Sequence, residues 1–183
     1  MTVIFANKHD IDCETLPKIW EGQSNINLIE IGKDTFDWED KVDEAISNEE
    51  DTLIFAGHGT KHGLLFPDFD KGIYILHENN VHLIKAKNVI CIWCYAANFC
   101  ETHNLHAFAT SMFISNSSEC HDHCIYGYSD DDIKKNSKRF DCELGELLDN
   151  KIPLNEWCER MIANMDANNA VDMFNRQGLT YII

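Results

Sequence analysis

Apolar residues along this chain gather into short runs that are separated by longer polar segments. The runs TLIFA over residues 52–56 and VICIW over 89–93 are continuous rather than alternating, which is typical of strands covered on both faces, as in a parallel sheet. Further strand-like runs occupy 2–6, 26–31 and the final residues 178–183. The pattern therefore predicts a sheet whose central strands are buried.

Helical periodicity fills several of the segments between these runs. Residues 37–50 place Val42, Ala45 and Ile46 on one helical face, and 153–165 begins with a proline, which the first helical turn tolerates. The remaining predictions are a hairpin from 63–66 and 72–76, helices over 94–104 and 140–150, a strand over 109–115, and a loop or helix edge over the charged stretch 129–139. Strands that alternate with helices predict an α/β fold with a mainly parallel central sheet flanked by helices.

The length and charge of the chain narrow its class. At 183 residues it is most simply a single domain. Its 31 acidic and 15 basic residues give a net charge of −16. That charge opposes binding to nucleic acid or an anionic membrane and would attract basic partners, unless it serves only to keep the surface soluble. No apolar run approaches the ~18 residues of a membrane span, and the first residues lack the features of a secretory signal, so we expect a cytoplasmic protein.

The eight cysteines show no regular spacing in a chain large enough to build a core, so we expect free thiols rather than disulfides. Two segments, CETHNLH over 100–106 and SECHDHC over 118–124, contain cysteines and histidines that can hold zinc. Neither contains a Cys-x-x-Cys pair, and polar loop histidines with part-buried thiols are the simpler interpretation. We therefore expect no metal and no cofactor.

Candidate chemistry lies where two of the predicted strands end. The run 52–56 is followed by the letters GHG, which place His58 between two glycines, and the run 89–93 is followed by Cys94. In parallel sheets, ligands bind outside the carboxyl ends of the strands, so His58 and Cys94 would meet if the two strands are neighbours. At the start of the predicted helix 94–104, the helix dipole would favour the thiolate, and the histidine would move a proton to the leaving group.

The same pair has a plain alternative, because a small buried cysteine beside a surface-loop histidine would give the same letters. If the pair is reactive, the backbone N–H groups of Gly59 and Cys94 would point to the substrate carbonyl oxygen as it becomes charged. The glycines around His58 would also let a substrate chain approach closely. Cys91 and Cys100 lie inside the predicted strand and helix, where we expect packing roles.

The segments LIFAGHGTKHGLLF (53–66) and NVICIWCYAANFC (88–100) together resemble the caspase-like cysteine peptidases of clan CD, especially the bacterial branch known as CHAT. The resemblance implies a caspase-like three-layer sandwich in which His58 is the base, Cys94 the nucleophile and Gly59 an oxyanion donor. The literal match is confined to these segments, although the order of elements agrees over most of the chain. The chain departs from many relatives in having a tryptophan directly before the nucleophile.

The resemblance also implies where the primary substrate pocket lies, between the loop after the first strand, 7–14, and the segment 115–123. A carboxylate there would select an arginine or lysine of the substrate, whereas solvated loop acids are the alternative. The expected substrate-binding residues are Asp10, Asp12, Ser115 and Glu119.

These observations predict a single caspase-like peptidase domain, 1–183, that acts as a cysteine endopeptidase and cleaves after a basic residue. The alternative is a catalytically inactive caspase-like module that binds a peptide or partner protein. The expected partners are a peptide or protein substrate and a regulatory protein, with no nucleic acid and no membrane. The basic residues within 129–139 also make that stretch a candidate for self-cleavage, unless it is a connector that is never cut.

Overall fold

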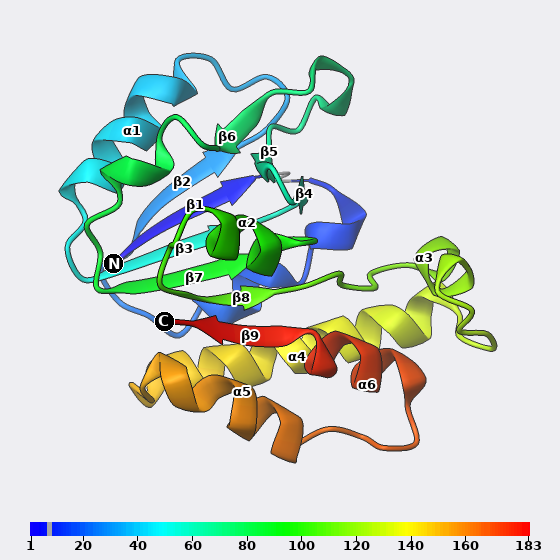
Figure 1. The fold of residues 1–183 in the computed structure, drawn as a ribbon. Coiled ribbons are helices and arrows are strands. Elements are labelled where there is room, and N and C mark those ends of the chain that lie inside the picture. Colours follow the sequence, from blue (N-terminus) through cyan, green and yellow to red (C-terminus); the bar gives the residue numbers. More distant parts are fainter. Residues whose placement is uncertain (7–8) are drawn as a thin grey trace.

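A six-stranded sheet forms the centre of the computed structural model, which describes residues 1–6 and 9–183 (Figure 1). The strand order is β2-β1-β3-β7-β8-β9, and every neighbouring pair is parallel except β8 and β9. The bounds are β1 Thr2–Ala6, β2 Asn27–Ile31, β3 Thr52–Ala56, β7 Asn88–Ile92, β8 Ala107–Thr110 and β9 Leu179–Ile182. A second, antiparallel sheet contains β4 Gly59–Thr60, β5 Gly63–Leu65 and β6 Tyr74–Leu76.

Helices cover both faces of the central sheet. The helices of the chain are α1 Trp38–Asn48, α2 Ala96–Thr102, α3 Ser117–Asp122, α4 Asp130–Asp149, α5 Leu154–Ala163 and α6 Ala170–Gln177, with 3-10 turns η1 Ile11–Cys13, η2 Leu16–Ile19, η3 Phe69–Lys71 and η4 Val81–Leu83. Helix α3 lies apart from the sheet, in a small cluster with α4 and α6. One hydrophobic core joins the sheet to α1, α2 and the small sheet, and a second joins its other face to η2, α4 and α5. The arrangement is consistent with a three-layer α/β sandwich.

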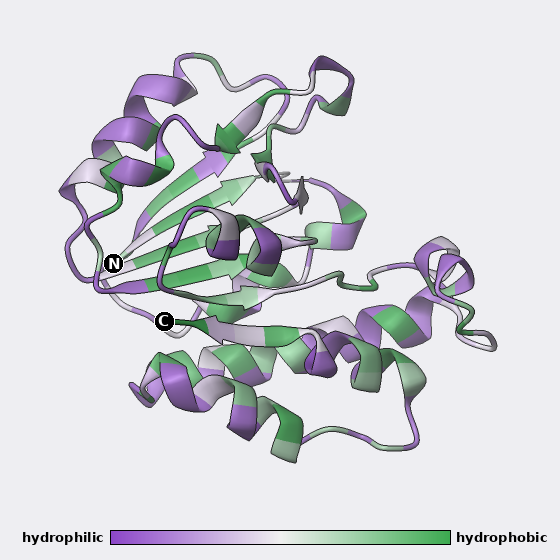
Figure 2. Ribbon diagram, viewed as in Figure 1, coloured by the Kyte–Doolittle hydropathy of each residue, from purple (hydrophilic) through white to green (hydrophobic). Residues whose placement is uncertain are grey.

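The continuous apolar runs are explained by these two cores. Side chains alternate along each strand, so neighbouring residues of one run enter different cores. Leu53, Phe55 and Cys91 belong to the core with α1 and α2, whereas Ile54 and Ile90 belong to the core with α4 and α5. In Figure 2 the strands of the central sheet are accordingly mostly green, the colour of hydrophobic residues.

Most of the predicted elements are confirmed. The strand predictions at 2–6, 26–31, 52–56 and 89–93 are confirmed to within one residue at each end, and the predicted hairpin is the antiparallel pair of β5 and β6. The predicted mixed α/β fold with a mainly parallel sheet flanked by helices is also confirmed. No helix among the described residues combines the length and apolar character needed to cross a membrane.

The predicted strand over 109–115 is wrong at its second half. Strand β8 ends at Thr110, which pairs with the first residue of β9. Beyond it, the backbone N–H and C=O of Ile114 bind the side-chain amide of Asn175 on α6, at 2.8 and 3.1 Å. The chain after Thr110 therefore leaves the sheet, and Ile114 is held by α6 instead.

The charged stretch 129–139, predicted as a loop or a helix edge, is the first half of the 20-residue helix α4. Ser129 caps the helix, and Asp132 completes a capping box with it. Ile133 and Phe140 are buried on one face of the helix. The helix alternative is therefore confirmed and the loop alternative is wrong, whereas self-cleavage of this stretch stays a prediction.

A buried ionic network ties α6 to α4. The guanidinium of Arg176 is fully buried; it donates to Asp172 at 2.8 Å and to Glu143 at 2.7 Å. Burial alone would raise the pKa of Asp172, but hydrogen bonds from Arg176, the Asp166 backbone and Arg139 outweigh it and lower that pKa. The pairing explains how a charged side chain is accommodated between helices.

Candidate active site

The carboxyl ends of β3 and β7 bring the two predicted catalytic residues together. Ala56 pairs with Ile92, and His58 and Cys94 each lie two residues beyond that pair. Both side chains line one small pocket on the face of the sheet that α4 covers. The prediction that adjacent parallel strands present His58 and Cys94 to the same cleft is therefore confirmed.

Hydrogen bonds on both sides of Cys94 hold the turn that carries it. The Thr110 hydroxyl accepts from the Trp93 N–H at 3.1 Å and donates to the Trp93 carbonyl at 2.7 Å, and the Tyr95 N–H donates to the Ser111 carbonyl at 3.0 Å. Tyr95 has a φ of 67°, in the left-handed region, which costs a non-glycine residue about 1 kcal/mol or more. Strained residues of this kind cluster at functional sites.

The Cys94 thiol is more strongly held in its protonated form than the sequence predicts. Burial, and to a smaller extent the negative charges of Glu119 and Asp12, raise its pKa to about 11. Helix α2 begins only at Ala96, two residues later than predicted, so Cys94 is not in its first turn. The expectation that the helix dipole favours the thiolate is therefore wrong, and any activation must come from a neighbouring base.

Cys91 and Cys94 form a Cys-x-x-Cys sequence, yet the two thiols are not partners. Cys91 is buried in the core with α2, and Cys94 lines the pocket on the other face. Cys91 lies within β7 and Cys94 lies two residues beyond its end, in the turn that leads to α2, which explains the separation. None of the eight cysteines, all of which lie within the described residues, takes part in a disulfide.

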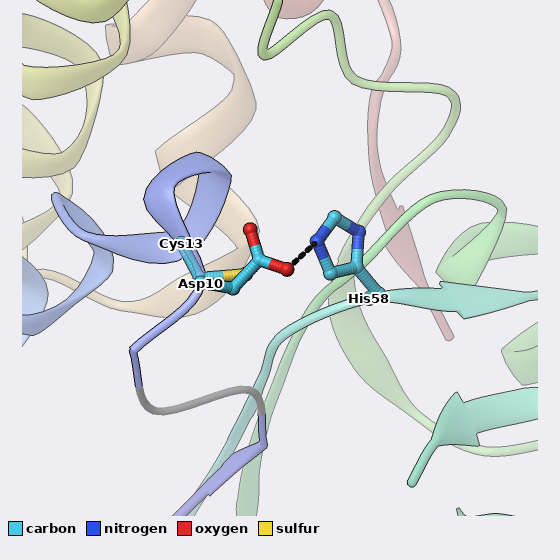
Figure 3. A group of neighbouring side chains, drawn as sticks. All are labelled: Asp10, Cys13 and His58. Carbon is cyan, nitrogen blue, oxygen red and sulfur yellow. Dashed lines mark ion pairs between the residues drawn. The ribbon is translucent and has the colours of Figure 1, made fainter. Parts of the chain in front are cut away.

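His58 is placed by an acidic neighbour and an aromatic one. Its Nε2 lies 3.5 Å from Oδ2 of Asp10, the ion pair drawn as a dashed line in Figure 3, and its ring and that of Phe69 meet in a T-shaped arrangement with the centroids 5.4 Å apart. Gly57 before it has a φ of 148°, and a Cβ there would lie 2.8 Å from the Ala6 carbonyl oxygen. Only glycine lets β3 pass β1 this closely before it presents the histidine.

Two features explain why the second glycine of the GHG motif, Gly59, lacks a side chain and could serve a substrate. Trp93 occupies the space that a Cβ would need, and the backbone N–H of Gly59 is not used by the small sheet. A Cβ on Gly59 would lie 2.0 Å from Cδ1 of Trp93. The His58 carbonyl accepts from Leu65 at 2.9 Å, so Gly59 faces Leu64 at a non-hydrogen-bonded position of the antiparallel pair. Its N–H therefore points away from β5, a geometry compatible with the predicted oxyanion role.

The tryptophan directly before Cys94, a departure from the family that the chain resembles, has its packing contacts in the core on the other face of the sheet. Trp93 belongs to the core with α2, meets Phe99 edge-on at 5.8 Å between centroids, and donates its indole N–H to the Thr60 carbonyl at 3.1 Å. The bulky residue before Cys94 thus supports the small sheet that begins directly after His58.

Two of the four predicted substrate-binding residues line the pocket. Asp12 and Ser115 contribute to its wall, and Asp12 accepts from Asn116 at 2.9 Å, which ties the two predicted segments together. Asp10 instead pairs with His58, and Glu119 accepts from the N–H and hydroxyl of Ser115 at 2.7 and 3.0 Å. Residues 7 and 8 of the predicted segment 7–14 lie outside the described residues.

Two polar residues of α4 line the same pocket and were not predicted from the sequence. Asp141 and Ser137 are one helical turn apart and only 2% and 5% exposed. Within the described chain, Oδ1 of Asp141 and Oγ of Ser137 have no hydrogen-bond partner. Burial raises the pKa of Asp141 to about 7, against a smaller lowering by the hydrogen bond from Thr15. The sequence signal that could have identified Asp141 is its position on the apolar face of a helix, where unpaired carboxylates are rare.

The pocket is small and acidic. About 40 Å³ of it is open to the centres of water molecules, which is room for a few waters or for the end of one narrow side chain. Its described lining contains two carboxylates, Asp12 and Asp141, and neither lysine nor arginine. A larger surface hollow of about 560 Å³ lies between α1 and the segment after β6, but no cysteine is among its described lining residues.

One cluster in the described residues has the composition of a metal site. Ligand atoms of Asp10, Cys13 and His58 all lie within 4.8 Å of one another (Figure 3). The two segments that sequence analysis considered for zinc, 100–106 and 118–124, form no such group of three in the described part of the chain.

No protein-family model matches this chain, and comparisons with curated proteins and with solved structures found no match either. The fold and the site therefore define a class in structural terms only: a mixed α/β domain with a mainly parallel sheet, a histidine and a cysteine at neighbouring strand ends, and an acidic pocket beside them.

Proposed function

We propose that this chain is a caspase-like cysteine endopeptidase in which Cys94 is the nucleophile and His58 the general base and acid. The observation that carries the proposal is the shared pocket. His58 and Cys94 reach it from adjacent strands, and a buried carboxylate, Asp141, lines it as well. A thiol, an imidazole and a selective subsite are the parts that acyl transfer from a peptide requires.

The proposed reaction begins with a neutral thiol. His58 takes the Sγ proton as Cys94 attacks the scissile carbonyl, and the Gly59 N–H stabilises the oxyanion that forms. His58 then gives the proton to the leaving amine, the C–N bond breaks, and an acyl-enzyme remains. Water, deprotonated by His58, hydrolyses that thioester. A single oxyanion donor typically contributes 10²–10³ in rate.

Asp10 acts in this proposal as a positioning residue. Its carboxylate lies 3.5 Å from Nε2 of His58 and would hold the imidazole in one orientation and favour the imidazolium that forms. The original expectation of substrate binding by Asp10 is replaced by this role, because its carboxylate faces the histidine (Figure 3).

The preference for a basic substrate residue is supported chiefly by Asp141. A lysine or arginine side chain that enters the pocket would offer N–H donors to the unpartnered oxygens of Asp141 and Ser137. Its positive charge would also favour ionised Asp141, which burial otherwise opposes. Asp12 adds a second negative charge to the wall of the pocket.

The second candidate function is an inactive caspase-like module that binds a peptide or a regulatory protein partner. It is favoured by the buried, protonated Cys94, whose pKa of about 11 leaves almost no thiolate at neutral pH. In this case the pocket would still take a basic side chain, but no bond would break.

Peptidase assays with matched peptides separate the two functions. Fluorogenic peptides with lysine or arginine before the reporter bond should be cleaved, and those with aspartate or leucine should not. A peptidyl chloromethyl ketone should alkylate Cys94. Cys94→Ala should abolish cleavage, whereas Cys124→Ala, which removes an exposed cysteine, should retain it. Labelling of another cysteine with full activity in Cys94→Ala would refute the assignment.

A further inference from the structure

The Asp10–Cys13–His58 cluster is built by elements that are far apart in sequence. Asp10 is the cap of the 3-10 turn η1 and Cys13 is its last residue. A 3-10 turn has three residues per turn, so residues three apart lie on the same side. His58 follows β3, which is paired with β1, the strand that leads into η1. Adjacent parallel strands thus bring the three side chains to one point (Figure 3).

The donor atoms suit zinc. A carboxylate oxygen, a thiolate sulfur and an imidazole nitrogen are the ligand types that zinc accepts, with Zn–N and Zn–O lengths of about 2.0–2.2 Å. Two such ligands in a tetrahedral site lie roughly 3.4 Å apart. The 3.5 Å between Asp10 Oδ2 and His58 Nε2 agrees with that spacing, and exceeds the 2.7–2.9 Å of a strong charge-assisted hydrogen bond.

The carboxylate is already oriented for this task. Oδ1 of Asp10 accepts the Asp12 N–H at 2.9 Å, which leaves Oδ2 directed at His58. Metal-binding carboxylates are usually fixed by such a second hydrogen bond. Cys13 is 3% exposed, so its thiol is shielded from bulk water while His58 and Asp10 remain accessible.

We propose that Asp10, Cys13 and His58 bind one zinc ion, with the fourth position open to water. On binding, the Cys13 thiol releases its proton to solvent, and His58 binds as neutral imidazole through Nε2. The two negative ligands then balance the charge of the ion. This differs from an ordinary Asp–His ion pair, which needs no thiol and would form equally well without Cys13.

The site shares His58 with the proposed catalytic pair, and this consequence rests on the proposed function. Zinc on Nε2 would fix the imidazole and remove it as a base, so the ion would act as a reversible inhibitor. Because the chain has a net charge of −16, cations are concentrated near its surface, and the inhibition should weaken as the salt concentration rises.

Cobalt titration tests binding without any measurement of activity. The reduced protein is freed of metal with a chelator and titrated anaerobically with Co²⁺. One equivalent should produce a sulfur-to-cobalt charge-transfer band in the near ultraviolet together with intense tetrahedral visible bands, and one equivalent of Zn²⁺ should remove both. Cys13→Ala should lose the charge-transfer band, and Cys124→Ala should keep it, since Cys124 is exposed and outside the cluster.

Cys13→Ser provides a smaller change if Cys13→Ala fails to fold, and circular dichroism verifies the fold of each variant. The absence of a stoichiometric band in the wild-type protein would overturn the proposal and leave a simple ion pair. A band that survives loss of Cys13 but not of Cys124 would overturn it as well. Peptide cleavage without cobalt binding would refute the zinc site alone, and cobalt binding without cleavage would refute the peptidase alone.

Discussion

Replacing Asp141 by asparagine should stabilise the protein, and the gain should depend on pH. Burial raises the pKa of Asp141 from its ordinary 3.8 to about 7. The folded protein therefore holds this proton more tightly than the unfolded chain does. Below pH 4 both states are protonated and the group contributes no difference, whereas stability falls as the pH rises from 4 to 7 because only the unfolded chain releases the proton.

The magnitude follows from the size of the shift. A difference of about 3 pKa units, at 1.36 kcal/mol per unit, corresponds to about 4 kcal/mol of stability lost above pH 7. Asparagine has a similar shape and cannot ionise, so Asp141→Asn should avoid this loss. We expect the free energy of unfolding of the variant, relative to wild type, to rise by up to about 4 kcal/mol between pH 4 and pH 8.

Urea unfolding at pH 4, 5.5 and 8 measures this difference directly. Glu146→Gln is a matched control, because Glu146 is exposed on the same helix, and its curve should follow that of wild type. The contrary outcome is a difference between the free energies of unfolding of Asp141→Asn and wild type that stays constant, within about 1 kcal/mol, across this pH range. That result would show that Asp141 is not a buried ionisable group. In the peptidase assay the same variant should lower kcat/KM for lysine and arginine peptides by about 10- to 100-fold.

Four other substitutions or treatments have expected outcomes. The rate at which iodoacetamide alkylates Cys94, followed by mass spectrometry, should increase with pH up to about 11. Glu119→Gln should increase that rate at pH 8, because it removes a negative charge that raises the Cys94 pKa. A rate that does not depend on pH would contradict this expectation. Gly59→Ala should cost about 1–3 kcal/mol in urea unfolding, because its Cβ would overlap Trp93; unchanged stability would show that the two segments separate easily. Arg176→Leu should cost about 3–5 kcal/mol because it removes the buried cation that pairs with Asp172 and Glu143, and calorimetry that shows no fall in Tm would contradict that value.

The strand predictions succeeded because a strand that is buried on both faces has a continuous apolar run in its own sequence. Every residue of β3 is buried, and the run TLIFA is apolar or small at each position as a result. The same reasoning located His58 and Cys94, since each follows such a run directly. That the two strands are neighbours, in a register that pairs Ala56 with Ile92, follows from the assembled sheet and was only a condition in the sequence argument.

Helix α4 shows how a local pattern can mislead. Its first turns are rich in charged residues. Because the stretch was judged by that charge, the capping box of Ser129 and Asp132 and the buried position of Ile133 were not predicted. A solvated face and a buried face alternate along one helix, so composition over a short stretch reports their average. Reading the stretch at helical spacing, from the cap onwards, would have joined it to the predicted helix that follows.

The surroundings of His58 and Cys94 depend on contacts between distant segments. Asp10 and Cys13 meet His58 because β1 lies beside β3, and Asp141 enters the pocket because α4 packs across η2 on that face of the sheet. Hydrophobic periodicity tells which side of a strand or helix is buried, but it does not tell which polar groups will share that interior. Long-range packing decides which polar groups lie there. It therefore also decides the pKa of Cys94, the partner of His58 and the charge of the pocket.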